Sequence, residues 1–191
     1  FGPGDAAPCK SVDVRHHAHI GLDTVTYLCD GAIRHQDSLG TDLVIRPGAV
    51  NWMTAGHGIV HSERTPQEER AAGQSMHGLQ TWVALPKAHE NVAPDFIHHP
   101  ADTLPTFEKN GASIRVLAGT AWEQTSPVAF PWDILYTAIE APTGASIILP
   151  ADLAEERAVY LVSGAVSIEG DTYDAGSMIV LSPGADVPVS F

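Results

Sequence analysis

The sequence predicts an all-β protein made of two tandem copies of one β unit, each forming a sandwich or barrel. Short runs rich in Val, Ile, Thr, Tyr and Trp alternate with glycine turns, as expected for many short strands joined by tight connections. The order of strand, turn, hairpin and turn occurs twice along the chain. Little helix is expected, with one short segment around residues 66–72.

The predicted turns recur at short spacing along both halves of the chain. Each is a dipeptide that ends in glycine, and these are Asp30-Gly31, Leu39-Gly40, Pro47-Gly48, Ala55-Gly56, Ser163-Gly164, Glu169-Gly170, Ala175-Gly176 and Pro183-Gly184. Glycine supplies the backbone conformations that tight turns require. The segments between these turns are therefore predicted to be strands.

An internal repeat defines the two copies. Residues 26–33 (TYLCDGAI) are echoed by residues 159–166 (VYLVSGAV), and in each copy a hairpin and a glycine turn lead into a further apolar strand. A strand followed by a turn glycine is common by chance, but the same order of features in both copies is not. The proline-punctuated stretch 94–105 is the predicted join. We place the boundary near Asn110, which gives an N-terminal domain of residues 1–110 and a C-terminal domain of residues 111–191.

The composition is that of an ordinary globular protein with a strongly acidic balance. The 191 residues include 23 acidic and 10 basic ones, and the formal net charge is −13. Affinity for nucleic acid comes largely from Lys and Arg, so direct binding of DNA or RNA is not expected. The longest apolar stretches, residues 145–149 and 178–181, are far too short to cross a membrane.

The compartment is predicted from the cysteines and from the start of the sequence. Cys9 and Cys29 do not make a disulfide framework. No charged segment followed by an apolar one opens the sequence, as a signal peptide would. A reducing, cytoplasmic location is the expectation.

Histidine is distributed unevenly, which points to chemistry in the first half. All ten histidines lie between His16 and His99. His17 and His19 are two residues apart, and so are His61 and Glu63. Because residues i and i+2 of a strand point to the same face, each pair should direct both side chains into one space.

Two such pairs on neighbouring strands would bring four ligands to one point inside a barrel. Three neutral imidazoles and one carboxylate suit Fe, Mn, Ni, Cu or Zn and are poor ligands for Mg or Ca. The sequence therefore predicts one divalent transition metal bound by His17, His19, His61 and Glu63. The remaining histidines have no such spacing: His16 should point outward, the direction of His57 between two glycines is left open, and His35, His77, His89, His98 and His99 are predicted to be surface or linker residues.

The densest part of the sequence resembles a known family. His17-Ala18-His19, then Asp23 and Gly31, is similar to the first cupin motif. The segments that resemble the pirin family are residues 17–27, 45–56 (IRPGAVNWMTAG), 58–63 (GIVHSE) and 78–83 (GLQTWV). The resemblance covers most of the chain and implies two tandem cupin barrels, of the double-stranded β-helix or jelly-roll type.

The resemblance also implies site residues and a metal. Pirins bind iron through positions that correspond to His17, His19, His61 and Glu63, so the resemblance implies Fe²⁺ as the ion of this chain. It places Trp52 and Gln80 around the metal cavity, although Trp52 has plain core packing as an equal alternative. Asp23 stands where other cupins have a metal-binding acid, and pirins do not generally use that position. The C-terminal copy has no histidine and resembles the metal-free second barrel of pirins.

Two functions follow from the resemblance, and the sequence leaves both open. Some bacterial pirins resemble quercetin 2,3-dioxygenases, which would make this chain a metal-dependent oxygenase acting on a small aromatic substrate with O₂, and Glu63 its catalytic base. Other pirins act through protein partners, as transcription cofactors or regulators of a metabolic enzyme, without catalysis. A storage or sugar-binding cupin is disfavoured because such proteins usually lack an intact ligand set.

Overall fold

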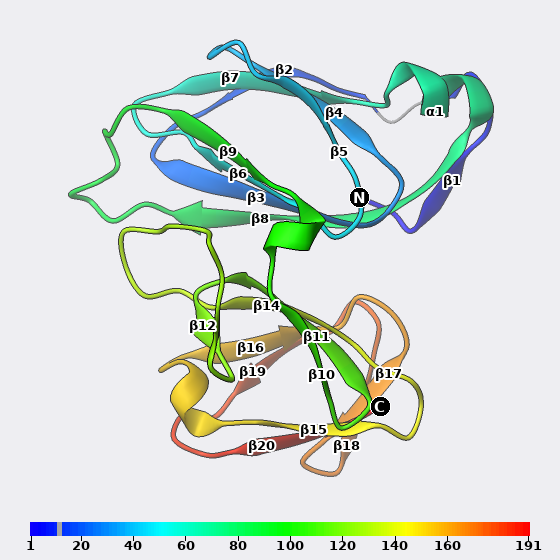
Figure 1. Cartoon of the computed structure of the whole chain (residues 1–191), viewed down its shortest axis with the longest axis vertical. Coiled ribbons are helices and arrows are strands. Elements are labelled where there is room, and N and C mark those ends of the chain that lie inside the picture. The colour runs from blue at the N-terminus through cyan, green and yellow to red at the C-terminus, as the bar shows by residue number, and fades with distance from the viewer. Residues whose placement is uncertain (11–12) are drawn as a thin grey trace. The chain divides into compact units, whose positions relative to one another are not determined.

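The computed structural model describes residues 1–10 and 13–191 and shows an all-β chain (Figure 1). Strands make up 52% of it and helices 6%, which confirms the predicted fold class. The chain divides into two compact units, Phe1–Thr103 and Leu104–Phe191. The boundary expected near Asn110 falls in a hairpin turn of the second unit. The domain boundary near Asn110 stays a prediction.

The first unit is built from two antiparallel sheets. One has the strand order β1-β8-β3-β6-β9 and the other the order β2-β7-β4-β5. Its strands are β1 (Gly4–Ala6), β2 (Val14–His19), β3 (Leu22–Asp30), β4 (Ile33–Asp37), β5 (Asp42–Ile45), β6 (Val50–Thr54), β7 (Ile59–Arg64), β8 (Gln74–Ala84) and β9 (Asp95–His99). The predicted helix is confirmed as α1 (Gln67–Ala72), which begins directly after Pro66, and a 3-10 turn follows at Ala101–Thr103.

The second unit contains shorter strands in smaller sheets. Their orders are β10-β11-β14, β12-β13, β15-β20-β17-β18 and β16-β19. The bounds are β10 (Thr106–Lys109), β11 (Ala112–Ala118), β12 (Thr120–Ala121), β13 (Gln124–Thr125), β14 (Tyr136–Glu140), β15 (Ser146–Leu149), β16 (Arg157–Tyr160), β17 (Ala165–Ile168), β18 (Asp171–Asp174), β19 (Met178–Leu181) and β20 (Val187–Ser190), with a 3-10 turn at Ala151–Leu153. All eight glycines of the predicted turns have positive φ, so these turns are confirmed in both units.

Strand register confirms the internal repeat. In the first unit β3 pairs with β6 so that Tyr27 lies opposite Val50. In the second unit β16 pairs with β19 so that Tyr160 lies opposite Met178. The sequence repeat matches Tyr27 with Tyr160 and Val50 with Met178. The two copies therefore share their pairing as well as their order of elements.

A backbone hydrogen bond at the second glycine turn is also shared. The amide of Gly48 donates to the carbonyl of Leu28 at 3.2 Å, and the amide of Gly176 donates to the carbonyl of Leu161 at 2.8 Å. In each copy this bond ties the turn to the end of the repeat's first strand. The copies can thus be compared residue by residue.

The two interiors differ in chemistry. An aliphatic cluster of the second unit includes Ile147, Val166, Ile179 and Val189. The first unit has smaller apolar clusters, around Leu28 and around Met53, and buries several histidines, acids and threonines beside them. Burial of polar side chains requires partners for them. The first interior is therefore the place to look for a site.

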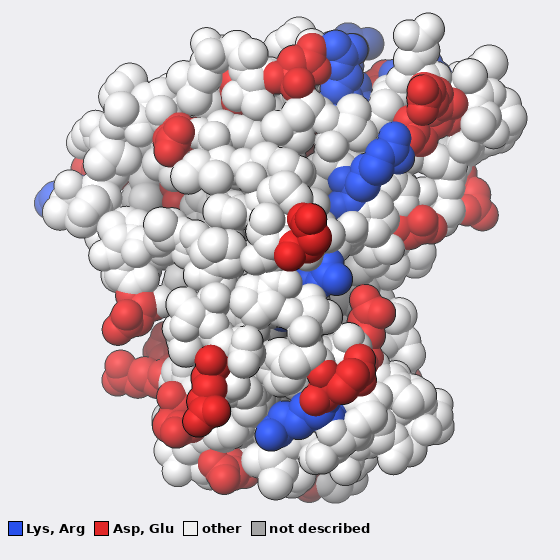
Figure 2. Space-filling view, viewed as in Figure 1, with Lys and Arg blue, Asp and Glu red and all other residues white. Residues whose placement is uncertain are grey.

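The distribution of charged side chains on the surface agrees with the acidic composition. Acidic side chains are spread over the face shown in Figure 2, with a few basic ones between them. Within residues 1–10 and 13–191, no helix is long and apolar enough to cross a membrane.

Candidate metal centre

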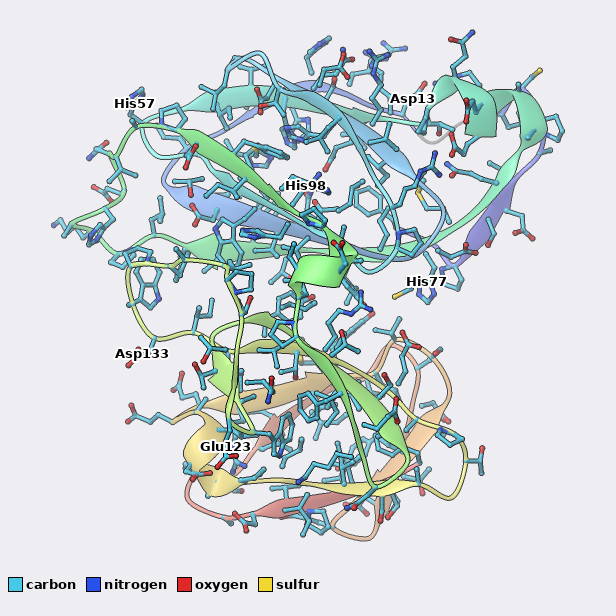
Figure 3. The ribbon with its side chains drawn as sticks, in the orientation of Figure 1. Asp13, His57, His77, His98, Glu123 and Asp133 are labelled. Carbon is cyan, nitrogen blue, oxygen red and sulfur yellow. The ribbon has the colours of Figure 1, made fainter. Side chains whose placement is uncertain are left out.

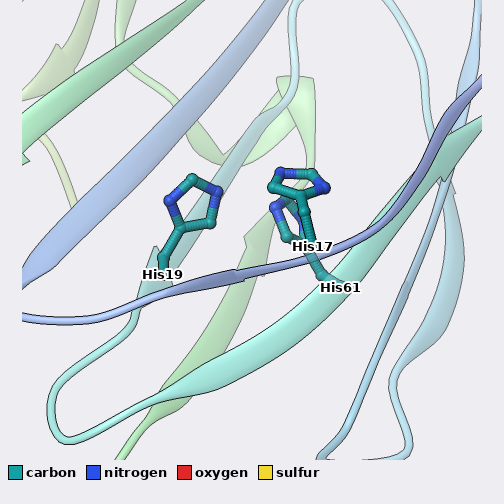
Figure 4. A group of neighbouring side chains, drawn as sticks. All are labelled: His17, His19 and His61. Carbon is teal, nitrogen blue, oxygen red and sulfur yellow. The ribbon is translucent and has the colours of Figure 1, made fainter.

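Three of the predicted ligands converge inside the first unit (Figure 4). His17 and His19 lie on β2, which pairs with β7 so that His17 is directly opposite His61. All three side chains point to the same side of this strand pair, as strand parity predicts. His61 is 1% exposed and His19 6%, while His17 is half-buried.

The spacing of the three rings suits one ion. One ligand atom from each lies within 4.8 Å of the others. The ring centroids of His17 and His61 are 4.3 Å apart, and those of His19 and His61 are 5.0 Å apart. Three nitrogens bound to one ion through bonds of about 2.0–2.1 Å lie at most about 3.6 Å from one another. The rings would therefore move together by roughly an ångström when they bind an ion.

The two buried rings, those of His19 and His61, are protonated as metal ligands should be. Burial, helped by the neighbouring histidines, lowers the pKa of His61 from 6.5 to about 3. Burial and the charge of His17 also lower the pKa of His19. Both rings are therefore neutral near neutral pH and each keeps one nitrogen lone pair. His17 Nδ1 lies 2.8 Å from the carbonyl oxygen of Arg15, a contact that places a hydrogen on Nδ1 and leaves Nε2 as the atom of this ring that could face a metal.

Two orphaned nitrogens show that these residues fit a metal. Among the described residues, the buried Nε2 atoms of His19 and His61 have no hydrogen-bond partner. Buried polar atoms are almost always partnered in proteins, so each such exception calls for an explanation. An ion held between the three rings would supply the missing partner for both atoms.

Glu63 lies beside this group and is not one of the three residues that form it. It is 5% exposed and pairs in register with His35 of β4. Its Oε1 accepts a short hydrogen bond from Gln80 Nε2, and the same amide donates to Thr26 Oγ1 at 3.3 Å. Burial raises the pKa of Glu63, against the lowering effects of the Gln80 hydrogen bond and of His17. Gln80 thus lies next to a predicted ligand, and its place at a metal cavity stays a prediction.

Asp23 and Trp52 lie elsewhere. Trp52 Nε1 donates to Asp23 Oδ2 at 2.7 Å, and both side chains are buried. On β6 the next residue, Met53, packs against Ile59, whose strand carries His61. Because neighbours in a strand point to opposite faces, Trp52 and its partner Asp23 are on the face away from the histidines. For Trp52 the geometry favours core packing, the alternative that the sequence left open.

His35 was predicted to be a surface or linker residue, and this was wrong. Its side chain is buried, and its Nδ1 is 3.5 Å from Nδ1 of His61. Its Nε2 is 3.0 Å from Oδ2 of Asp37, another buried group. The signal was present in the sequence, because His35 and Asp37 have the same i, i+2 spacing as the predicted ligand pairs.

The other histidines separate into outer and inner positions. His16 is exposed, as predicted, and His57 is exposed at the turn between β6 and β7 (Figure 3). His98 lies further in, with Nδ1 2.7 Å from Oδ1 of Asn51. None of these residues belongs to the group formed by His17, His19 and His61.

Register identifies the corresponding positions of the second unit. The repeat matches His35 with Ile168. His35 pairs with Glu63 on β7, and Ile168 pairs with Val189 on β20. Glu63 therefore corresponds to Val189.

The histidine positions follow from the same alignment. Two residues before Glu63 and Val189 stand His61 and Val187, and their partners across the next strand pair are His17 and Leu149. Val187, Val189 and Leu149 are all buried in the aliphatic core of the second unit. Side chains without donor atoms occupy the places where the first unit has its candidate ligands.

Comparison with known proteins agrees with this geometry. The sequence pattern that defines the Pirin family matches residues 1–83. A pirin-like protein of Caulobacter vibrioides is 45% identical over 180 residues, which are 93% of this chain and 62% of that protein. Mouse pirin is 35% identical over 156 residues, which are 81% of this chain and 52% of that protein. The chain thus spans between about half and three fifths of the length of these relatives.

A solved structure matches over nearly the whole chain. It is that of a quercetin 2,3-dioxygenase from Acinetobacter baumannii, with a TM-score of 0.91 and 35% sequence identity. The match covers 99% of this chain and 62% of that one. The duplicated β unit, the two pairs of candidate ligands in the first copy and these relatives together place the chain in the pirin family.

Proposed function

We propose that this chain forms the metal-binding core of an oxygenase of the quercetin 2,3-dioxygenase type. The observation that carries the proposal is the convergence of His17, His19 and His61, with two buried nitrogens that lack partners, beside a buried carboxylate. The similarity to a quercetin 2,3-dioxygenase supports the choice of reaction. Iron is the proposed ion, and His17, His19, His61 and Glu63 would hold it.

The metal would supply a Lewis acid that lowers the pKa of a substrate hydroxyl close to it. Glu63 is the group of this chain that accepts the proton of that hydroxyl. Its burial favours the protonated form, which makes the carboxylate a stronger base than an exposed one. Gln80 holds Oε1 through its amide and so orients the carboxylate toward the rings. The substrate anion would then react with O₂, opening the ring with release of carbon monoxide.

An aromatic side chain at the site supports an aromatic substrate. Trp82 is 62% exposed, and its ring meets that of His19 edge-on with centroids 5.1 Å apart. Its Nε1 donates to Oε1 of Gln80 at 3.3 Å, which links the indole to the amide that holds Glu63. An exposed indole offers a flat apolar surface on which a flavonol ring can stack.

The decisive experiment is oxygen uptake with quercetin by iron-loaded protein, with carbon monoxide measured in the same vessel. Uptake and carbon monoxide in equal amounts are expected from the wild type, and neither from His61→Ala. Loss of a ligand should remove iron and activity together. Absence of uptake from protein that has taken up iron would refute the oxygenase proposal. It would favour the regulatory function, in which the metal centre supports binding to a protein partner.

A further inference from the structure

A buried carboxylate–imidazole pair lies behind His61. On β4, Asp37 stands directly opposite His61 of β7, and His35 stands opposite Glu63. The side chains of His35 and Asp37 are 6% and 0% exposed, and His35 Nε2 is 3.0 Å from Asp37 Oδ2. The ring of His35 stacks on Phe96 with centroids 4.3 Å apart. Packing thus holds the imidazole between the carboxylate and His61.

Backbone amides hold the carboxylate in one orientation. Oδ1 of Asp37 accepts the amide hydrogens of Leu39 at 2.9 Å and of Thr41 at 3.0 Å. These bonds leave Oδ2 to face His35. An ionised carboxylate can only accept hydrogen bonds, so the ring hydrogen of His35 belongs on Nε2.

The position of the ring hydrogen on His35 determines the position of the ring hydrogen on His61. With Nε2 of His35 protonated, its Nδ1 presents a lone pair to Nδ1 of His61, 3.5 Å away. Only a hydrogen on Nδ1 of His61 makes this contact favourable. A neutral imidazole carries one such hydrogen, so Nε2 of His61 keeps its lone pair. That atom is the buried nitrogen without a partner.

We propose that Asp37 and His35 are positioning residues that set the tautomer of His61, so that its Nε2 lone pair is presented to the metal centre. The inference rests on the proposed function in one respect, the role of His61 as a ligand. Ligating histidines commonly donate their second N–H to a carboxylate or carbonyl, which orients the ring and strengthens the ligand. Here the carboxylate acts through one intervening imidazole.

Asp37→Asn should reverse the positions of the ring hydrogens on His35 and His61. The amide oxygen of asparagine would keep the hydrogen bonds from Leu39 and Thr41, which turns its NH₂ toward His35. His35 would then accept on Nε2 and donate from Nδ1, which forces the hydrogen of His61 onto Nε2. The corresponding substitution in the Ser-His-Asp triad also gives the wrong tautomer while leaving the geometry intact. Asp42→Asn is the matched control, because Asp42 is an exposed carboxylate on the next strand and pairs with Arg34.

The readout is the ring nitrogens of the metal-free protein, labelled with ¹⁵N-histidine and observed by long-range proton–nitrogen correlation near neutral pH. The His61 signals are assigned by their loss in His61→Gln. We expect His61 to be protonated on Nδ1 in the wild type and in Asp42→Asn, and on Nε2 in Asp37→Asn. Anaerobic Fe²⁺ titration should show affinity about 10–100-fold weaker for Asp37→Asn and unchanged for Asp42→Asn.

Two results would overturn the inference. One is a wild-type His61 that carries its hydrogen on Nε2, and this measurement decides the matter even if Asp37→Asn does not fold. The other is a folded Asp37→Asn protein with the wild-type tautomer. If the tautomer of His61 reverses in Asp37→Asn but the wild type binds no Fe²⁺, the control of the tautomer by Asp37 and His35 is upheld. The proposed metal centre is then refuted.

Discussion

Replacing the carboxylate of Glu63 by an amide removes its negative charge while keeping the shape of the side chain. Glu63→Gln keeps an oxygen that can accept from Gln80, but it loses nearly all basicity. If Glu63 is the base, turnover should fall about 10²–10⁴-fold, the usual contribution of general-base assistance. Three imidazoles should retain the ion, so iron per chain should fall far less.

The measurements for Glu63→Gln are iron content and quercetin-dependent oxygen uptake, with His61→Ala as the comparison that loses both. A Glu63→Gln protein with its iron and near wild-type turnover would exclude the base role while leaving the metal centre intact.

For the candidate site, the sequence predicted side-chain direction. Alternation along a strand is a local property, and in the structure His17, His19 and His61 lie together while Glu63 is not in that group. The same alternation, applied to residues 51–53, would have separated Trp52 from the cavity. The spacing of His35 and Asp37 was visible in the sequence and was overlooked. Its meaning depends on the register of β4 against β7, which brings His35 to His61 and which neither strand encodes alone.

Among the elements, the turn between β6 and β7 positions the strand that carries His61 and Glu63. Gly56 adopts φ of +50°, and a Cβ there would collide with the carbonyl of Val92. The amide of the next residue, His57, donates to the same carbonyl at 2.9 Å. The turn is thus packed against the segment that leads into β9.

We predict that Gly56→Ala is more destabilising than Gly58→Ala. Both glycines have positive φ, but a Cβ at Gly58 meets nothing within 4 Å. Backbone strain should cost about 1–2 kcal/mol at Gly56, whose φ of +50° is left-handed, and about 1–3 kcal/mol at Gly58, whose φ is +141°. The collision at Gly56 should add about 1–3 kcal/mol, which makes its total loss the larger. Denaturant unfolding of both variants measures the difference, and equal losses would show that the contact with Val92 is unimportant.

The repeat shows how far elements could be predicted. Residues 26–33 and 159–166 predicted two copies, and the shared register of β3–β6 and β16–β19 confirms them. The division into many small sheets in the second unit was not predictable, because it depends on which short strands find partners. The sequence pattern predicts where the strands lie, whereas the grouping of strands into sheets depends on pairing between segments far apart in the sequence.

At the scale of the whole molecule, we predict one transition-metal ion per chain. Positions equivalent to His17, His61 and Glu63 in the second unit are Leu149, Val187 and Val189, which are buried and have no donor atoms. Elemental analysis after dialysis against metal-free buffer should give one equivalent. Two tightly held equivalents would show that a second site exists elsewhere in the chain.

The polar interior of the first unit has a consequence for how the protein responds to its surroundings. Imidazoles and a carboxylate stand where the second unit has aliphatic side chains, so the metal-free first unit forgoes part of its hydrophobic stabilisation. Binding of an ion to the folded state alone would restore about 2.7 kcal/mol at a hundred times Kd. In calorimetry, added Fe²⁺ should raise the melting temperature of the first unit and leave that of the second in place. The folded fraction of the first unit would then depend on the concentration of available metal. In a cell short of metal, proteolysis would begin in the first unit.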